Sequence, residues 1–183
     1  MTRLGPGELT LAQIAAEAGV TAGALAQRFG SKRALLLALA ERAAEGAGDF
    51  IGGLRAQHGS PLATVRAYAE CMAHLAQSPA ALARNLAYLQ IDLADADFRA
   101  HLTAQARTTR AAIADLLAEA VAVGELAPGT DVATLARSVE VAMNGALLTW
   151  AFDQQDPAAA FIRASVDAVL APHLLHQHPS NAR

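Results

Sequence analysis

The residues near the N-terminus whose types and spacing could do chemistry are hydroxyls and bases. Thr10 and Thr21 each precede a helix-forming segment, where a side-chain oxygen can accept a hydrogen bond from a free backbone N–H. Arg28, Lys32 and Arg33 follow, with no acidic residue near them in the sequence. Such a strip can bind phosphate groups even though the whole chain carries a net charge of -3. The pattern predicts a local contact with nucleic acid.

Other reactive side chains do not form a recognisable catalytic or metal-binding set. Cys71 is the only cysteine, which excludes an internal disulfide and suits a reducing compartment. His173, His176 and His178 follow a proline in a polar tail, without the fixed ligand spacing that a metal site requires. No nucleophile is paired with a base. We therefore expect no enzyme activity, no metal and no cofactor.

Three acidic residues stand close together at Asp92, Asp95 and Asp97. We interpret them as a loop and the start of a helix, where negative charge is favoured by the helix dipole, rather than as a catalytic carboxylate pair.

The composition predicts a helical protein that is not embedded in a membrane. The hydrophobic fraction of 54% is largely alanine spread through charged sequence. The uncharged stretch from Val141 to Phe152 is shorter than the roughly 20 residues that a spanning helix needs. Gly5, Pro6 and Gly7 stand where a signal peptide would be apolar. We expect a soluble, cytoplasmic protein.

Helix boundaries are marked by capping residues. A Ser or Asp precedes Pro at Ser60-Pro61, Ser78-Pro79 and Asp156-Pro157, and Pro suits the first position of a helix. Thr10 with Gln13 predicts a capping box, Thr21 and Ser31 predict further caps, and Gly124 predicts a helix end. Apolar residues repeat at helical spacing between these marks. We expect an all-α chain of about eight helices.

The segment from Thr10 to Phe29 has the pattern of a helix-turn-helix. Ile14 and Ala15 are expected in the core, Gly19 at the turn between the helices, and Val20 inside. Leu25 and Phe29 would hold the second helix, whose exposed N-terminal residues would face the major groove of DNA.

The residues directly after this pattern identify a family resemblance. The run Phe29-Gly30-Ser31-Lys32-Arg33-Ala34-Leu35-Leu36 resembles the F-x-S-K-x-x-L-L sequence of the tetracycline-repressor-like (TetR) bacterial transcriptional regulators. The resemblance is sharp over residues 9 to 45 and architectural beyond them. It implies an N-terminal helix-turn-helix domain (1–46) and a C-terminal helical domain for ligand binding and dimerisation (47–172). The polar sequence after Pro172 predicts a flexible tail (173–183).

The resemblance also implies which side chains contact DNA. Thr10 and Lys32 would contact phosphates, which positions the protein without reading sequence. Gln27 and Arg28 are the candidates for direct readout of bases. The residues implied to face the groove are Thr21, Ala22, Gly23, Ala24, Gln27 and Arg28.

Two departures from the family pattern stand in this sequence. The family usually has an aromatic residue at the position of Ala26, where it reaches a phosphate. The family also begins with a long amphipathic helix, whereas Gly5, Pro6 and Gly7 lie within the few residues before Thr10. We expect that first helix to be missing or truncated, which would leave the apolar face of the helix-turn-helix partly uncovered.

The family implies a homodimer through the last two helices, predicted at 131–150 and 157–171, that spaces two recognition helices for a pseudo-palindromic double-stranded DNA operator. The predicted function is a ligand-responsive repressor released by a small, largely apolar effector. Candidate ligand contacts are mid-helix and apolar or weakly polar: Met72, Leu75, Tyr88, Leu89, Phe98, Met143, Asn144, Leu147 and Trp150. Among them, Asn144 needs a hydrogen-bond partner in ligand or protein, such as a second subunit.

Three alternatives remain open from the sequence alone. The Thr10–Phe29 segment could be an ordinary hairpin of an alanine-rich bundle. A LacI-type head would match the first twenty residues, but not Ser31–Leu36. Finally, the chain could be a TetR-like helical dimer that binds a small molecule or protein and has lost DNA binding.

Overall fold

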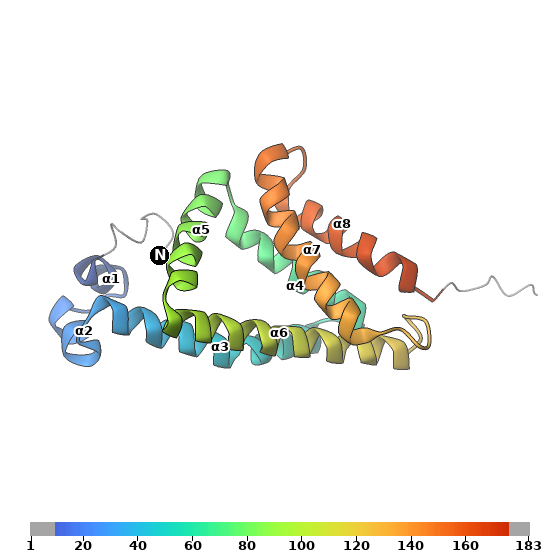
Figure 1. Cartoon of the computed structure of the whole chain (residues 1–183), viewed down its shortest axis with the longest axis horizontal. Coiled ribbons are helices and arrows are strands. Elements are labelled where there is room, and N and C mark those ends of the chain that lie inside the picture. Colours follow the sequence, from blue (N-terminus) through green and yellow to red (C-terminus); the bar gives the residue numbers. More distant parts are fainter. Residues whose placement is uncertain (1–9, 176–183) are drawn as a thin grey trace, which may run out of the picture. The chain divides into compact units, whose positions relative to one another are not determined.

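Every regular element of the computed structural model, which describes residues 10–175, is a helix (Figure 1). The α-helices are α1 Leu11–Glu17, α2 Ala22–Phe29, α3 Lys32–Gln57, α4 Pro61–Met72, α5 Pro79–Ala94, α6 Ala96–Ala122, α7 Val132–Asp153 and α8 Ala158–Leu170. Two short 3-10 helices, η1 Ala73–Ala76 and η2 Ala171–His173, follow α4 and α8. Within the described residues, the nearest thing to a sheet is one isolated bridge between Leu126 and Leu174. The all-α prediction is confirmed.

Most of the predicted helix caps are confirmed. The Ser60 and Ser78 hydroxyls accept hydrogen bonds at 3.1 Å from the backbone N–H groups of Ala63 and Ala81, with Pro at the first helical position in both cases. Gly124, two residues after the end of α6, has φ +78°, a conformation that glycine adopts without strain. Local side-chain chemistry therefore accounts for these three boundaries.

The predicted cap at Asp156 is wrong. Helix α8 begins one residue later than expected, at Ala158, and its N-cap is Pro157 with no side-chain hydrogen bond. The loop instead points the backbone carbonyl of Asp156 at Trp150, whose indole Nε1–H donates to it at 2.8 Å. A tertiary contact with a buried indole thus replaces the expected local cap.

The chain divides into two compact units that do not follow simple sequence order. Unit 1 comprises residues 10–49 and 75–109 of the described chain, and unit 2 comprises 50–74 and 110–175. Helices α3 and α6 each contribute one part to unit 1 and the other part to unit 2. The sequence-based boundary at residue 46 remains a prediction.

In unit 1, the first part of α3 runs parallel to the first part of α6. Arg33, near the start of α3, contacts Asp97 in the first turn of α6. Further along both helices, a Cβ atom placed on Gly48 would lie 3.5 Å from Thr108 Cγ2, which is ordinary van der Waals contact. The small residues of α3 therefore allow close approach of the two helices.

Unit 2 is held by the hairpin of α7 and α8, with α4 packed against α8 (Figure 1). Ion pairs join α4 to α8 at Arg66–Asp167 (2.6 Å) and Glu70–Arg163 (2.8 Å). The largest side chains with no solvent exposure include Val65, Ile113, Leu117, Val139, Ile162 and Val166. These residues form the apolar core of unit 2.

The first three residues of the predicted tail, 173–175, are held by hydrogen bonds. His173 lies in η2, and its carbonyl accepts a hydrogen bond from Ala127 N–H at 2.8 Å, while Leu175 N–H donates to the Glu125 carbonyl at 3.1 Å. Residues 173–175 are therefore held against the loop after α6. The rest of the predicted tail, 176–183, lies outside the described residues, as does the predicted missing helix before Thr10.

Candidate nucleic-acid interface and ligand cavity

Helix α1 is capped as its sequence predicts. Thr10 N–H donates to the Gln13 side-chain oxygen at 2.8 Å, and Gln13 N–H donates to Thr10 Oγ1 at 3.3 Å, which completes the capping box. The turn that follows contains Gly19 at φ +68°, and Thr21 Oγ1 then accepts from Ala24 N–H at 3.1 Å. Two caps and one glycine thus form the helix-turn-helix.

Helix α2 packs against the rest of unit 1 through one narrow face. Leu25 and Phe29 pack against a small cluster around buried Ile14 and Leu35, to which Tyr88 of α5 also contributes. All of the residues expected to face the groove are exposed on the remaining surface: Thr21, Ala22, Gly23, Ala24, Gln27 and Arg28. The N-terminal part of α2 is therefore exposed to solvent, and its contact with DNA remains a prediction.

The placement of Val20 was predicted wrongly. Ile14 and Ala15 are buried as expected, but Val20 is 46% exposed. The turn at Gly19 carries it past the end of α1, where Val20 N–H bonds to the Ala15 carbonyl at 2.9 Å. The cluster around Ile14 and Leu35 closes without its side chain.

The positive charge of the interface is smaller than the sequence suggested. Arg28 is exposed and its guanidinium carbon lies 5.3 Å from the centre of the Phe29 ring, a cation–π contact. Lys32 is half-buried at the first residue of α3. Arg33 instead lies between two carboxylates, with Nη2 2.7 Å from Asp95 Oδ2 and 2.8 Å from Asp97 Oδ2. Arg33 is therefore paired with carboxylates, and contacts of Arg28 and Lys32 with DNA remain a prediction.

The contacts of Arg33 with Asp95 and Asp97, which we call the Arg33 fork, join the start of α3 to the junction of α5 and α6. Arg33 Nε also donates to Asp95 Oδ2 at 3.1 Å, so the planar guanidinium is held at more than one nitrogen. The Asp95 carboxylate in turn accepts from the backbone N–H of Asp97 at 2.9 Å, capping α6. The fork holds the pKa of Asp95 below its usual value, chiefly through the hydrogen bond from Arg33.

Sequence reasoning missed this fork. Asp95 and Asp97 lie at a helix start as expected, whereas Asp92 lies in the last turn of α5 and not in a loop. Arg33 was counted only as part of the local basic charge available for DNA. Arg33 lies 62 and 64 positions from Asp95 and Asp97 in sequence. Nothing in the local pattern of either segment pairs them.

A cavity of about 310 Å³ lies beside the fork in unit 1, and we call it the α3–α5 cavity. It is lined from three helices by Lys32, Arg33, Leu36, Ala40, Tyr88, Ile91, Asp92, Asp95 and Phe98. Tyr88 and Phe98 are two of the nine predicted ligand contacts. Burial raises the pKa of the Tyr88 phenol.

The other seven predicted ligand contacts lie elsewhere. In unit 1, Leu75 and Leu89 are exposed at 42% and 38%. In unit 2, Met72 ends α4 and is half-buried, while Asn144 is exposed on α7. Three α7 residues are buried: Met143, Leu147 and Trp150. The structure thus divides the predicted set between the two units, and its role in ligand binding remains a prediction.

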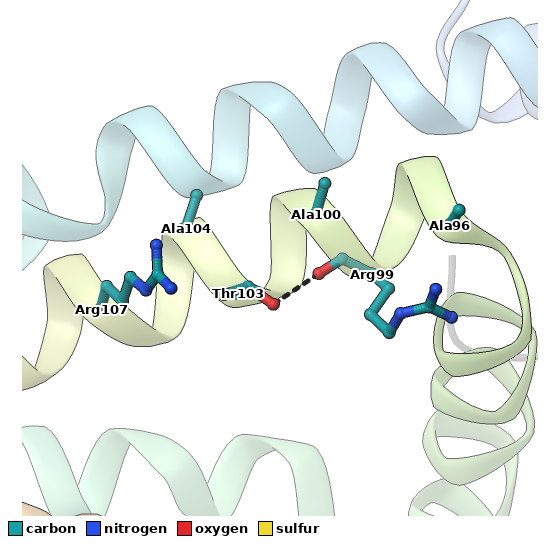
Figure 2. Close-up of a pocket in the computed structure, with 6 residues that line it drawn as sticks. All are labelled: Ala96, Arg99, Ala100, Thr103, Ala104 and Arg107. Carbon is teal, nitrogen blue, oxygen red and sulfur yellow. Dashed lines mark hydrogen bonds between the residues drawn. The ribbon is translucent and has the colours of Figure 1, made fainter.

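A second groove, of about 390 Å³, runs along one face of α6 in unit 1 (Figure 2). Its six lining residues repeat at helical spacing and are Ala96, Arg99, Ala100, Thr103, Ala104 and Arg107. Thr103 Oγ1 donates back to the Arg99 carbonyl at 2.8 Å, the dashed line of Figure 2. One helix supplies all of these residues, so the groove is a shallow stripe of small side chains between two arginines.

Two family models match the chain. One, "Bacterial regulatory proteins, tetR family", covers residues 2–39. The other, "Tetracyclin repressor-like, C-terminal domain", covers residues 87–166. A comparison with curated proteins gives no match.

Solved structures with the same fold cover most of the chain. The repressor SmeT of the Stenotrophomonas maltophilia multidrug efflux pump SmeDEF is 21% identical, with a TM-score of 0.65 over 97% of this chain and 87% of that one. A TetR transcription regulator from Haloarcula marismortui gives 18% identity and a TM-score of 0.70 over 92% and 88%. Thermus thermophilus FadR, a TetR-family repressor solved with lauroyl-CoA, gives 20% and 0.56 over 97% and 91%.

These structural superpositions establish a shared fold, and the two family models establish the class of protein. The chain belongs to the TetR family of transcriptional regulators, with an N-terminal helix-turn-helix for DNA binding and a C-terminal helical domain. Regulators of this family are transcription factors and not enzymes.

Two further findings concern residues 10–175 only. No helix there is long and apolar enough to cross a membrane. Likewise, no three or more His, Cys, Asp or Glu side chains of these residues are grouped so that they could hold a metal ion.

Proposed function

We propose that the protein acts as a homodimer that represses transcription by binding a pseudo-palindromic operator, and that a small molecule releases it. The observation that carries the DNA-binding part is the exposed surface of α2. Its first turn presents Ala22, Gly23 and Ala24, whose small side chains let the helix approach base edges closely, with Gln27 and Arg28 one turn further on.

The dimer part is supported by an apolar outer face on the α7–α8 hairpin. Val141 and Phe152 of α7 are 65% and 86% exposed, and Leu148 between them is 44% exposed. The exposed residues of α8 include three alanines at four-residue spacing: Ala160, Ala164 and Ala168. Exposed apolar side chains on both helices favour packing of a second hairpin, because exposed apolar patches are commonly buried in stable interfaces.

Fluorescence anisotropy with DNA flanking the gene, titrated at several salt concentrations, tests the operator. We expect the observed affinity to fall steeply with salt, because bound phosphates release counterions. Lys32→Ala should weaken binding to all sequences and lower the salt slope by about 1, because one phosphate is then no longer neutralised. Arg28→Ala should weaken binding too, with a loss of base preference if Arg28 reads a base. Absence of binding at low salt would favour a dimer without DNA binding.

Arg42→Ala is the matched control, because Arg42 is an exposed arginine of α3 ten residues, or about 15 Å, beyond Lys32. It should leave the affinity and the salt slope nearly unchanged. If Arg42→Ala and Lys32→Ala weakened DNA binding equally, the effect would reflect overall charge and not the proposed contact.

Lys32 also allows a direct test, since it is the only lysine of the chain. An amine-reactive label can be located on the Lys32 peptide by mass spectrometry. We expect operator DNA to slow this labelling, and labelling at an unchanged rate on saturated protein would contradict a phosphate contact at Lys32.

A further inference from the structure

The α3–α5 cavity differs from the groove on α6 in having walls from several helices. Leu36 and Ala40 come from α3, Ile91 from α5 and Phe98 from α6, and together they supply an apolar surface. Its volume of about 310 Å³ lies at the lower end of the range for small-molecule sites. The cavity is therefore large enough for a ligand of one or two rings.

Two bases, Lys32 and Arg33, and two carboxylates, Asp92 and Asp95, line the α3–α5 cavity. Arg33 is bound to Asp95 and also to Asp97, which lies outside the lining.

Asp92 is the carboxylate that the fork leaves over. Among the described residues, the Asp92 carboxylate has no hydrogen bond and no ion pair. The charged group that acts on it electrostatically is the Asp95 carboxylate. Burial and this like charge raise the pKa of Asp92. A partly buried carboxylate without a cation is unfavourable, so an ammonium group beside it would be stabilised.

We propose that the α3–α5 cavity binds a small organic cation, an ammonium on an apolar or aromatic body, through Asp92, and that its occupation lowers affinity for DNA. The second half rests on the proposed function. This effect on DNA affinity is inferred from two lining residues that are also connected with the helix-turn-helix. Lys32 is a predicted phosphate contact, and Tyr88 packs against the Ile14–Leu35 cluster that supports α2. A ligand touching both would act on the DNA-binding surface directly.

Isothermal titration calorimetry on the DNA-free full chain tests the binding site with two probes that share an indole ring. Tryptamine is an ammonium ion at neutral pH and indole-3-acetate is an anion. We expect tryptamine to bind with a dissociation constant of about 1 mM or below and to bind tighter than the anion by about ten-fold or more. Failure of tryptamine to bind, or equal binding of the two probes, would overturn the proposal.

Asp92→Asn keeps the shape of the side chain and removes its charge. We expect it to weaken tryptamine binding about ten-fold or more. Asp115→Asn, at an exposed carboxyl of α6 outside the cavity, removes the same charge and should leave binding unchanged. Equal losses in the two variants would overturn the assignment to Asp92.

The melting temperature separates binding from support of the fold. Because the pKa of Asp92 is raised, its ionisation opposes folding at neutral pH. Asp92→Asn should therefore raise the melting temperature at pH 7 while it weakens tryptamine binding. A fall in both the melting temperature and the affinity would mean that Asp92 supports the fold, and would overturn the proposal.

Operator titrations with and without saturating tryptamine test the regulatory half. We expect tryptamine to weaken DNA binding by the wild type and to leave Asp92→Asn unaffected. Tryptamine binding with no change in DNA affinity would overturn the regulatory half alone. If the protein binds no DNA at all, the proposed function fails, whereas the calorimetric result on the cavity stands independently.

Discussion

At the scale of residues, the most consequential side chain is Arg33, which joins α3 to the start of α6 instead of facing DNA. Arg33 directly follows Lys32, the predicted phosphate contact, and both residues line the α3–α5 cavity together with Asp95. A change at the α5–α6 junction can therefore reach the DNA-binding surface through one short chain of contacts.

The Arg33–Asp95 contact predicts a specific pH dependence of stability. The pKa of Asp95 is lowered in the folded state, so its contribution is present above the ordinary carboxyl pKa and disappears as pH falls through the lowered value. Asp95→Asn should flatten the decline of stability at acidic pH while it preserves the cap of α6, because Asn is also a good N-cap. Thermal melts between pH 7 and pH 2.5 measure this.

Asp49→Asn is the control for that comparison, because Asp49 is an exposed carboxyl of α3 in the same unit. It should follow the wild-type pH curve. If Asp95→Asn followed the wild-type dependence of stability on pH, the Arg33 fork would contribute nothing to stability at acidic pH.

At the scale of elements, the turn between α2 and α3 determines the orientation of the recognition helix α2 relative to α3. Gly30 adopts φ +73° and ψ -45°, and Ser31 N–H bonds to the Phe29 carbonyl at 2.9 Å, which makes a tight γ-turn. Ser31 Oγ then caps α3 by accepting from Ala34 N–H at 3.1 Å. The conformation suits glycine for backbone reasons alone, since an added Cβ would meet nothing within 4 Å.

Gly30→Ala should therefore destabilise the protein through backbone strain, by about 1 kcal/mol or more. Gly46→Ala is the matched control in the same unit. Gly46 lies inside α3, and a Cβ there would also meet nothing within 4 Å, so alanine should stabilise by up to about 1 kcal/mol. Opposite shifts of the melting temperature are expected, and a destabilisation by Gly46→Ala equal to that of Gly30→Ala would contradict the strain argument.

At the scale of the whole molecule, the exposed apolar residues of the α7–α8 hairpin predict the state of assembly. The double variant Val141→Glu with Phe152→Glu places charges on the proposed dimer face and should convert the dimer to a monomer in light-scattering measurements. Operator affinity should fall with it, because a monomer presents a single recognition helix.

Val123→Glu is the control, since Val123 is 59% exposed but lies after α6, outside the hairpin. It should remain dimeric. A wild type that is monomeric at micromolar concentration, or a dimer that survives the double variant, would contradict the proposed interface.

Sequence alone was enough to predict the elements of this protein, because the chemistry that starts and ends them is local. Hydroxyls before proline at Ser60 and Ser78, the Thr10–Gln13 box and the glycine at 124 each act within a few residues. The Phe29–Leu36 run together with the helix-turn-helix pattern also predicted the family, because both lie within one short segment.

Contacts between distant segments required the folded chain. Arg33 finds Asp95 and Asp97 more than 60 residues away, Trp150 takes the carbonyl of Asp156 in place of a cap, and Val20 turns outward. The nine residues of the α3–α5 cavity come together only when α3, α5 and the start of α6 pack. Local propensity specifies a helix and its ends, whereas the pairing of charges and the shape of a cavity depend on which helix faces meet.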